Sequence, residues 1–273
     1  EVAYDPNLAV PTEVYVDIAY QAGDGDGSEA KPYPTLAAGT AAAGDGTTVH
    51  AAAGTYEEAG IEIGLGVTLV GEGTASVVVG TSGADYVFRV LGTLSSVTVT
   101  GNTGGDGVDC DGSAAVVQNC VIHTNGDRGI EIQDGATATI ATCIIHDSTR
   151  AGIYVGELST ATVSDSEIYN NQYGVWGFER SDGSIVVSGC TIRDNTEEGI
   201  ITWGQDLTLT TSVLHGNGGS GVAVASNSSY NAIVRIENCL VYENAGVAGL
   251  ITKAFGGGTI TVDIVNCTVT ANT

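Results

Sequence analysis

Side chains that can transfer protons or bind metals recur at a nearly constant interval in the chain. His123 and His146 are 23 residues apart, Tyr169 and Arg193 follow at similar intervals, and Asp147 adjoins His146. Two imidazoles beside a carboxylate can act as general acid and base, or as ligands of zinc or copper. Rings at equal phase can also stack into a solvated column that supports neighbouring strands. The pattern leaves three hypotheses open: catalysis, metal binding and a structural column.

A second periodic set changes from carboxylates to aromatic rings along the chain. Exposed rings stack on the faces of sugars, and carboxylates accept hydrogen bonds from hydroxyl groups. We therefore predict a face that binds carbohydrate or another surface protein, unless a long loop such as 177–184 folds over the rings and buries them. The set comprises Asp109, Glu131, Tyr154 and Trp176, with Phe178 and Trp203 two residues beyond the same phase.

The first two members of this set, Asp109 and Glu131, also admit an enzymatic interpretation. On neighbouring strands their backbones would stand roughly 5 Å apart, near the carboxyl separation that retaining glycosidases use. The chain holds 32 Asp and Glu residues, however, so carboxylate pairs are common in it. The pair alone therefore does not predict an activity.

One glycine-rich loop near the N-terminus has the residue types of a calcium site. Its candidate ligands are Asp24, Asp26, Ser28 and Glu29, separated by glycines in the order Asp-Gly-Asp-Gly-Ser-Glu. Alternating oxygen ligands on a tight turn are typical of calcium loops, although this one is shorter than a helix–loop–helix calcium loop. The alternative is a flexible acidic loop. Calcium is therefore the cofactor that we predict for this loop.

These residues must be positioned by a repeat that runs through most of the chain. From Val99 to Val269, an apolar residue, two variable residues and usually Asn recur eight times, 22 to 28 residues apart. A period of this length is typical of a solenoid. Within one period, such as 115–138, three short segments alternate apolar and polar residues between turns rich in Gly, Asn and Asp. We predict three short parallel strands per coil, with residues of equal phase paired between coils.

Two further columns are predicted to point inward. The repeat asparagines should stack at one corner, each amide bonding the next. Five cysteines share one phase and should form either a column of buried thiols or disulfides at Cys120–Cys143 or Cys239–Cys267. The sixth, Cys110, is off this phase and is predicted to lie in the core.

Composition narrows the choice of partners. The 273 residues carry a formal net charge of −24, which disfavours nucleic acid, anionic membranes and unaided binding of polyuronates. No apolar run is long enough for a transmembrane helix, and no signal peptide is visible. The chain begins Glu-Val-Ala-Tyr, as we would expect of a processed or trimmed product. We expect a secreted or cell-surface bacterial protein.

Several sequence segments resemble the right-handed parallel β-helix repeats of the pectin-lyase-like superfamily. They include Ile236-Glu-Asn-Cys-Leu-Val-Tyr-Glu-Asn244 and Asp127-Arg-Gly-Ile-Glu-Ile132, and Gly44-Asp-Gly-Thr-Thr-Val49 resembles part of the N-terminal cap. The resemblance implies an all-β, right-handed parallel β-helix solenoid. Residues 1–60 would form an N-terminal segment and cap, with a short helix at about 35–43. Residues 61–273 would form the coils, which we expect to continue beyond the C-terminus.

Signatures of the familiar enzymes in this superfamily are missing. The chain has no paired Asp, no Gly-His-Gly, no Arg-x-Lys and no Arg-x-x-Pro, and its only lysines are Lys31 and Lys253. The leading hypothesis is therefore a binding protein that is not an established catalyst. The alternatives are a polysaccharide lyase or glycoside hydrolase using His123, His146, Tyr169 or Arg193, and a structural stalk, adhesin or filament segment that self-associates end to end.

Overall fold

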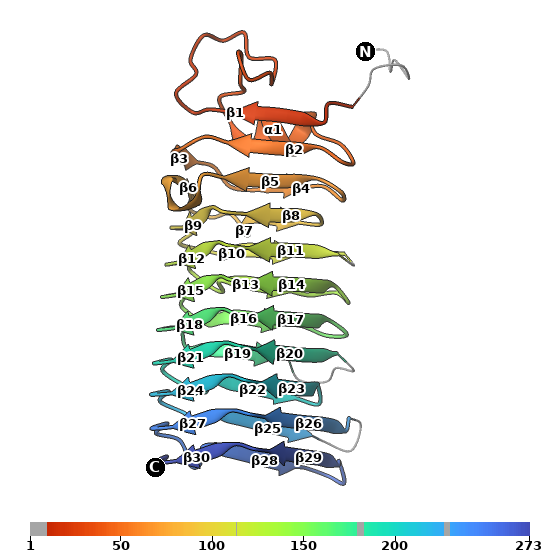
Figure 1. Ribbon diagram of the computed structural model, residues 1–273, viewed down its shortest axis with the longest axis vertical. Helices are drawn as coiled ribbons and strands as arrows, with labels where there is room; N and C mark the ends of the chain where they lie inside the picture. The colour runs from red at the N-terminus through yellow and green to blue at the C-terminus, as the bar shows by residue number, and fades with distance from the viewer. Residues whose placement is uncertain (1–9, 113, 179–182, 227–229) are drawn as a thin grey trace.

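The protein is a right-handed parallel β-helix in which the coils stack along one axis (Figure 1). The computed structural model describes residues 10–112, 114–178, 183–226 and 230–273. Each complete coil supplies one strand to each of three parallel sheets, as the repeat predicted. The helix α1 (Leu36–Ala42) lies near the N-terminal end, and η1 (Gly73–Ala75) is a short 3-10 turn.

Three sheets, named here sheet 1, sheet 2 and sheet 3, form the walls of the solenoid. Sheet 1 contains, in spatial order, β1 (Glu13–Val16), β2 (Thr48–Ala51), β5 (Thr68–Gly71), β8 (Thr93–Ser95), β11 (Ala115–Gln118), β14 (Thr137–Ala141), β17 (Thr160–Ser164), β20 (Ser184–Ser188), β23 (Asp206–Thr210), β26 (Ala232–Glu237) and β29 (Ile260–Val265). Sheet 2 contains β4 (Ile61–Ile63), β7 (Tyr86–Val90), β10 (Asp106–Cys110), β13 (Ile130–Ile132), β16 (Ala151–Val155), β19 (Tyr173–Gly177), β22 (Ile200–Trp203), β25 (Val222–Ser226) and β28 (Leu250–Ala254). Sheet 3 contains β3 (Gly54–Glu57), β6 (Ser76–Val79), β9 (Thr98–Thr100), β12 (Val121–His123), β15 (Ile144–His146), β18 (Glu167–Tyr169), β21 (Thr191–Arg193), β24 (Val213–His215), β27 (Leu240–Tyr242) and β30 (Thr268–Thr270).

The core consists of the inward residues of the short strands, except in β28, β29 and β30 of the last coil, which have no buried residue. In β14, Ala138 and Ile140 are buried while Thr137 and Thr139 are exposed, which is the alternation that a strand with one solvated face requires. The repeat's apolar residue is fully buried in successive coils, as at Ile122, Ile145, Ile168, Ile192 and Leu214. Register follows from this pattern, because a slip of one residue would turn the buried set outward.

The asparagine column forms the predicted amide ladder. The Nδ2 group of Asn195 donates to Oδ1 of Asn217 at 2.9 Å, and Asn217 donates to Asn244 at 2.8 Å. From Asn171 onward the amides also donate to a backbone carbonyl of the preceding coil, as Asn217 does to Ile192 at 3.2 Å. The ladder therefore satisfies corner backbone that would otherwise be buried without partners.

The cysteine column points inward and consists of free thiols rather than disulfides. Cys120, Cys143, Cys190 and Cys239 are buried, and the Sγ of each lies near the carbonyl two residues earlier, as at Cys143 and Ala141 (3.3 Å). Cys110 lies in the core, as predicted.

The N-terminal helix is confirmed close to its expected position. Thr35 caps it by accepting a hydrogen bond from the backbone N–H of Ala38 at 3.2 Å, and the Glu58 carboxylate accepts from Leu36 and Ala37. Leu36 is buried against the first coil. No helix in the described ranges is long and apolar enough to cross a membrane.

Candidate functional site

The predicted carboxylate-to-aromatic set forms one column on the outer side of sheet 2. Asp109 pairs in register with Glu131, Glu131 with Tyr154, and Tyr154 with Trp176. The structure therefore brings together four residues that the sequence places 22 or 23 positions apart. This set is called the acidic–aromatic column below.

Most of this column is less accessible than the sequence suggested. Asp109, Glu131 and Tyr154 are each only 8% exposed. The guanidinium carbon of Arg128 lies 4.2 Å from the centre of the Tyr154 ring and covers it. The expectation of an exposed ring is therefore wrong for Tyr154. The ring is covered by Arg128, which lies on the preceding coil. Residues 179–182, which belong to the loop proposed above to cover the rings, lie outside the described residues.

Arg128 also binds the carboxylates beneath it. Its Nη1 lies 2.6 Å from Oε1 of Glu131 and 3.5 Å from Oδ2 of Asp106, and its backbone N–H donates to Oδ1 of Asp106 at 2.7 Å. Sequence reasoning missed Asp106 and Arg128. The only signal was the position of Arg128 in the turn before β13, where an arginine can reach back by one coil.

The exposed part of the aromatic cluster lies further along the same sheet. Tyr154 and Trp176 meet edge to face at 5.2 Å, and Phe178 approaches Tyr154 at 6.1 Å. Tyr173 lies 5.2 Å from Trp176. Phe178 is 38% exposed, and Trp176 is partly exposed under the guanidinium of Arg150 at 4.9 Å. These rings offer the surface on which a ligand ring can stack.

Trp203, which was grouped with these rings, has a different neighbour. It stacks on Phe255 with centroids 6.2 Å apart and planes within 6°, and the Nζ of Lys253 lies 4.8 Å from the Phe255 ring. The pair borders a separate apolar cleft of about 200 Å³ over Ala223 and Ile251. The predicted face thus consists of two aromatic regions.

An acidic cleft of about 360 Å³ lies at the other end of the column. Asp109 and Glu131 line it together with Asp106, Asp127 and Tyr86. Burial raises the pKa of Asp109 to about 6, although Arg89 opposes the shift. Burial and the adjoining Asp106 carboxyl raise the pKa of Glu131 to about 8, and burial also raises the pKa of Asp106. Carboxyl groups that differ in protonation near neutral pH can act as acid and base.

The histidine set forms a second column on sheet 3, called the ring column below. The rings of His123 and His146 stack at 4.9 Å, and those of His146 and Tyr169 at 4.7 Å. Arg193 lies over Tyr169 at 4.1 Å. His146 Nδ1 lies 2.6 Å from Asp147 Oδ2, and burial together with His146 lowers the pKa of His123. The arrangement is that of a stacked structural column, and catalysis by these four residues stays a prediction.

The candidate calcium loop is organised by its own side chains. Asp24 pairs with Lys31 at 2.7 Å and accepts from the Tyr20 hydroxyl at 2.6 Å, while Asp26 accepts from the Ser28 hydroxyl at 2.6 Å. Over the described ranges, His, Cys, Asp and Glu side chains form no group of three suited to a metal ion. Calcium binding stays a prediction.

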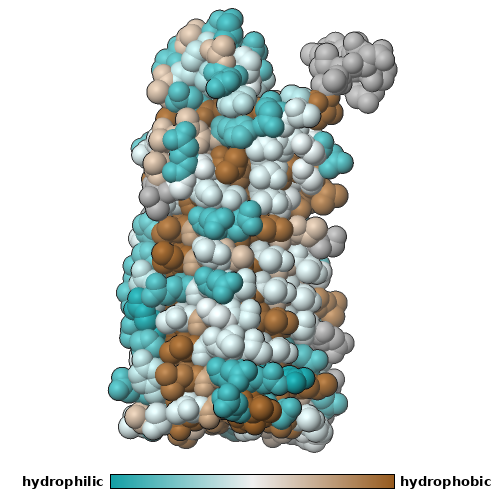
Figure 2. Space-filling view, viewed as in Figure 1, coloured by the Kyte–Doolittle hydropathy of each residue, from teal (hydrophilic) through white to brown (hydrophobic). Residues whose placement is uncertain are grey.

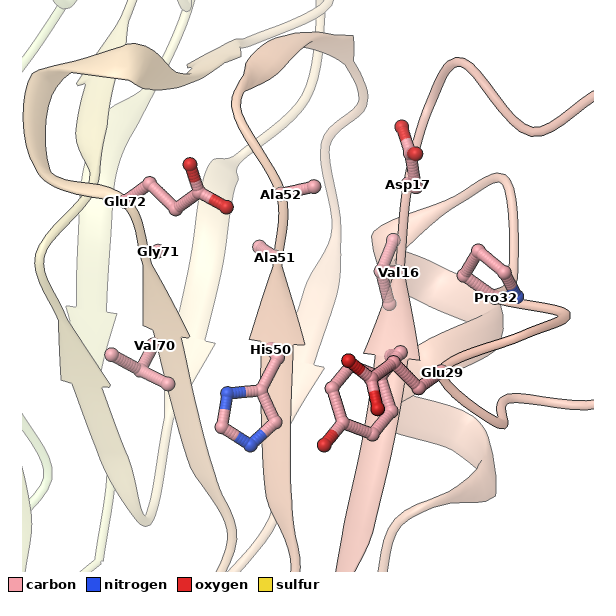
Figure 3. Close-up of a pocket in the computed structure, with 11 residues that line it drawn as sticks. Val16, Asp17, Glu29, Pro32, His50, Ala51, Ala52, Val70, Gly71 and Glu72 are labelled. Carbon is pink, nitrogen blue, oxygen red and sulfur yellow. The ribbon is translucent and has the colours of Figure 1, made fainter.

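The fourth predicted calcium ligand, Glu29, lies at a cleft of about 350 Å³ between the first coils and the loop that contains Pro32. Figure 3 shows Glu72 extending across this cleft toward Ala52, with Asp17 and Pro32 on the opposite side. Tyr15 and His50 stack on one another at 4.9 Å along its wall. No periodic signal marks this cleft, because one wall is a loop outside the repeat.

Three parallel sheets with an in-register asparagine ladder define a parallel β-helix. A sequence model described as "Right handed beta helix region" matches residues 77–235 and 180–273, so the chain belongs to this family. A comparison with curated protein sequences gave no significant match.

Several solved structures share the fold. The A-module of mannuronan C-5 epimerase AlgE4 from Azotobacter vinelandii is 18% identical over 87% of this chain and 93% of the epimerase module, with a TM-score of 0.57. Pectate lyase Pel9A is 16% identical over 97% of this chain and 80% of the lyase, with a TM-score of 0.59. The periplasmic alginate epimerase AlgG is 14% identical over 82% of this chain and 61% of its own, with a TM-score of 0.57. At these identities the likeness establishes the fold.

Proposed function

We propose that the protein binds carbohydrate through the outer side of sheet 2. The observation that carries this proposal is that residues of an acidic cleft and of an aromatic cluster pair in register on neighbouring strands of sheet 2. Glu131 borders the cleft and pairs with Tyr154, which contacts Trp176 and Phe178. Carboxylates would accept hydrogen bonds from sugar hydroxyls, and the partly exposed rings would stack on sugar faces.

The surface of the molecule varies in polarity, and the similar structures suggest a ligand class. The face seen in Figure 2 mixes hydrophilic and weakly polar side chains with scattered apolar patches. The similar structures include a mannuronan C-5 epimerase, a pectate lyase and an alginate epimerase, which supports a carbohydrate as the ligand class. The alginate epimerase is periplasmic, and we propose that this protein also lies outside the cytoplasm.

Binding of the purified chain to a panel of oligosaccharides tests the proposal. Replacement of Trp176 by Ala should weaken binding about tenfold, because a stacked ring contributes roughly 1 kcal/mol or more. Tyr242→Ala is the matched control, since Tyr242 is an outward ring that stacks on His215 at 4.9 Å on sheet 3. Equal affinity of the Trp176→Ala variant and the unaltered protein for every ligand would contradict the proposal.

A second candidate function is hydrolysis or elimination of a glycan in the acidic cleft. It is favoured by Asp109 and Glu131, whose raised pKa values would place one ionised and one protonated carboxyl side by side near neutral pH. Turnover would appear as new chain ends in a digested polysaccharide, and Glu131→Gln should abolish it. Binding without new chain ends would leave the protein a binding module.

A further inference from the structure

The acidic cleft contains more carboxyl groups than the nearby cations neutralise. Its walls include Asp85, Asp106, Asp109, Asp127 and Glu131. Arg128 pairs with three of these residues and Arg150 with Asp127. Within the described part of the chain, Asp85 and Asp109 form no ion pair. The cleft therefore presents a local excess of negative charge in addition to the net charge of −24.

One carboxyl group in this cleft has an unfilled hydrogen-bonding position. Asp109 is 8% exposed, and its Oδ1 atom is buried without a partner among the described residues. A buried acceptor without a donor destabilises the folded protein, and more so when the acceptor is ionised. Because the pKa of Asp109 is about 6, the group is largely ionised at neutral pH. A ligand that supplies an N–H donor with a positive charge would relieve this cost.

The geometry points to an oligomer of an amine-bearing sugar as the ligand, with one ammonium group at Asp109 in the acidic cleft and further sugar units extending along the sheet toward Trp176, three strands away. This inference rests on the proposed carbohydrate binding and narrows its ligand class. The register leads from Asp109 through Glu131 and Tyr154 to Trp176, so both chemistries lie on consecutive coils. A uronate would place its carboxylate among these acidic groups, and like charges repel.

The test compares oligosaccharides of equal length by calorimetry: oligomers of glucosamine, of N-acetylglucosamine and of galacturonate. Near pH 6.5 the free amine is protonated, and about 0.15 M salt screens general attraction to the acidic surface. We expect the glucosamine oligomer to bind at least tenfold tighter than the acetylated one, and the galacturonate oligomer to bind weakest.

Variants locate the effect. Asp109→Asn should cost about tenfold in affinity for the glucosamine oligomer. Asp85→Asn, on the exposed rim, should also weaken binding and is a second variant if Asp109→Asn fails to fold. Asp263→Asn is the control, since it removes the same charge from exposed β29 on sheet 1.

The outcomes separate the inference from the function on which it rests. Equal affinity for the amine and acetylated oligomers would overturn the inference and leave carbohydrate binding intact. Tighter binding of galacturonate, or normal affinity in both cleft variants, would also overturn it. Absence of binding to all three oligomers, and to the wider panel, would overturn the proposed function itself.

Discussion

Two arginines lie over tyrosine rings on two different faces of the β-helix. Arg128 covers Tyr154 at 4.2 Å on sheet 2, and Arg193 covers Tyr169 at 4.1 Å on sheet 3. The contact is the same, but the surroundings differ. The Arg128 side chain is 14% exposed, whereas that of Arg193 is 28% exposed.

The carboxylates that contact the two arginines also differ in solvent exposure. Asp106 and Glu131, which contact Arg128, have side chains 8% and 11% exposed. Glu167, which Arg193 contacts at 2.7 Å, is 38% exposed. Solvent screens charges around the ring column, while those around the acidic–aromatic column are taken out of water. We therefore expect an outward column in a solenoid to become a chemical site where its charged groups are desolvated, and not through in-register stacking alone.

The largest expected effect is on stability when each arginine is removed. Arg128→Ala should destabilise the fold by about 3–5 kcal/mol, because it leaves buried carboxyl groups without their cation. Arg193→Ala should cost about 0–1 kcal/mol, as for an exposed pair. Urea unfolding of the two variants at neutral pH measures both values. Equal losses would remove the distinction between the columns.

The next effect concerns pH. The pKa of Glu131 is raised from 4.5 to about 8, so across this range the folded state binds more protons than the unfolded chain. Stability from this group is therefore present at low pH and is lost as pH rises toward 8. Glu131→Gln should reduce this loss of folding stability, by on the order of 2 kcal/mol over the pH range between the two pKa values.

Urea midpoints of the Glu131→Gln variant and of the unaltered protein, measured from pH 5 to pH 8, test this expectation. Glu167→Gln on sheet 3 is the matched control, because it removes an exposed carboxylate that also contacts an arginine. Comparison of the two variants separates the effect of the buried carboxyl from that of removing any carboxylate beside an arginine. A Glu131→Gln variant with an unchanged slope would show that the buried carboxyl does not retain its proton.

Periodicity was enough to predict which residues become neighbours. Parallel in-register pairing places equal phases side by side, so the contact of His123 with His146 and that of Glu131 with Tyr154 follow from sequence positions alone. The apolar alternation within each strand decides which of these columns faces outward.

Residues in turns could not be predicted in this way. Arg128 lies in the turn before β13, where backbone direction depends on local dihedrals rather than on the repeat, and its side chain reaches Asp106 on the preceding coil. The separation of Trp203 from Trp176 has a similar origin. Trp203 stacks on Phe255, a residue just beyond the end of β28 whose position the repeat does not specify.

The smallest effect has the opposite sign and belongs to the ring column. Burial and the neighbouring His146 lower the pKa of His123 below its ordinary value of 6.5, so near that pH the folded state binds fewer protons than the unfolded chain. Its stability contribution is present above pH 6.5 and is lost on acidification. His123→Gln should therefore lessen acid destabilisation, by less than about 0.5 kcal/mol because solvent screens this partly exposed group. Thermal unfolding between about pH 5 and pH 7.5 measures this change, and His215→Gln, which removes another imidazole from sheet 3, is measured in parallel. If His123→Gln instead changed stability as pH rises, as is expected for Glu131→Gln, the ring column would behave like the acidic–aromatic column. Burial would then not be the property that distinguishes the two columns.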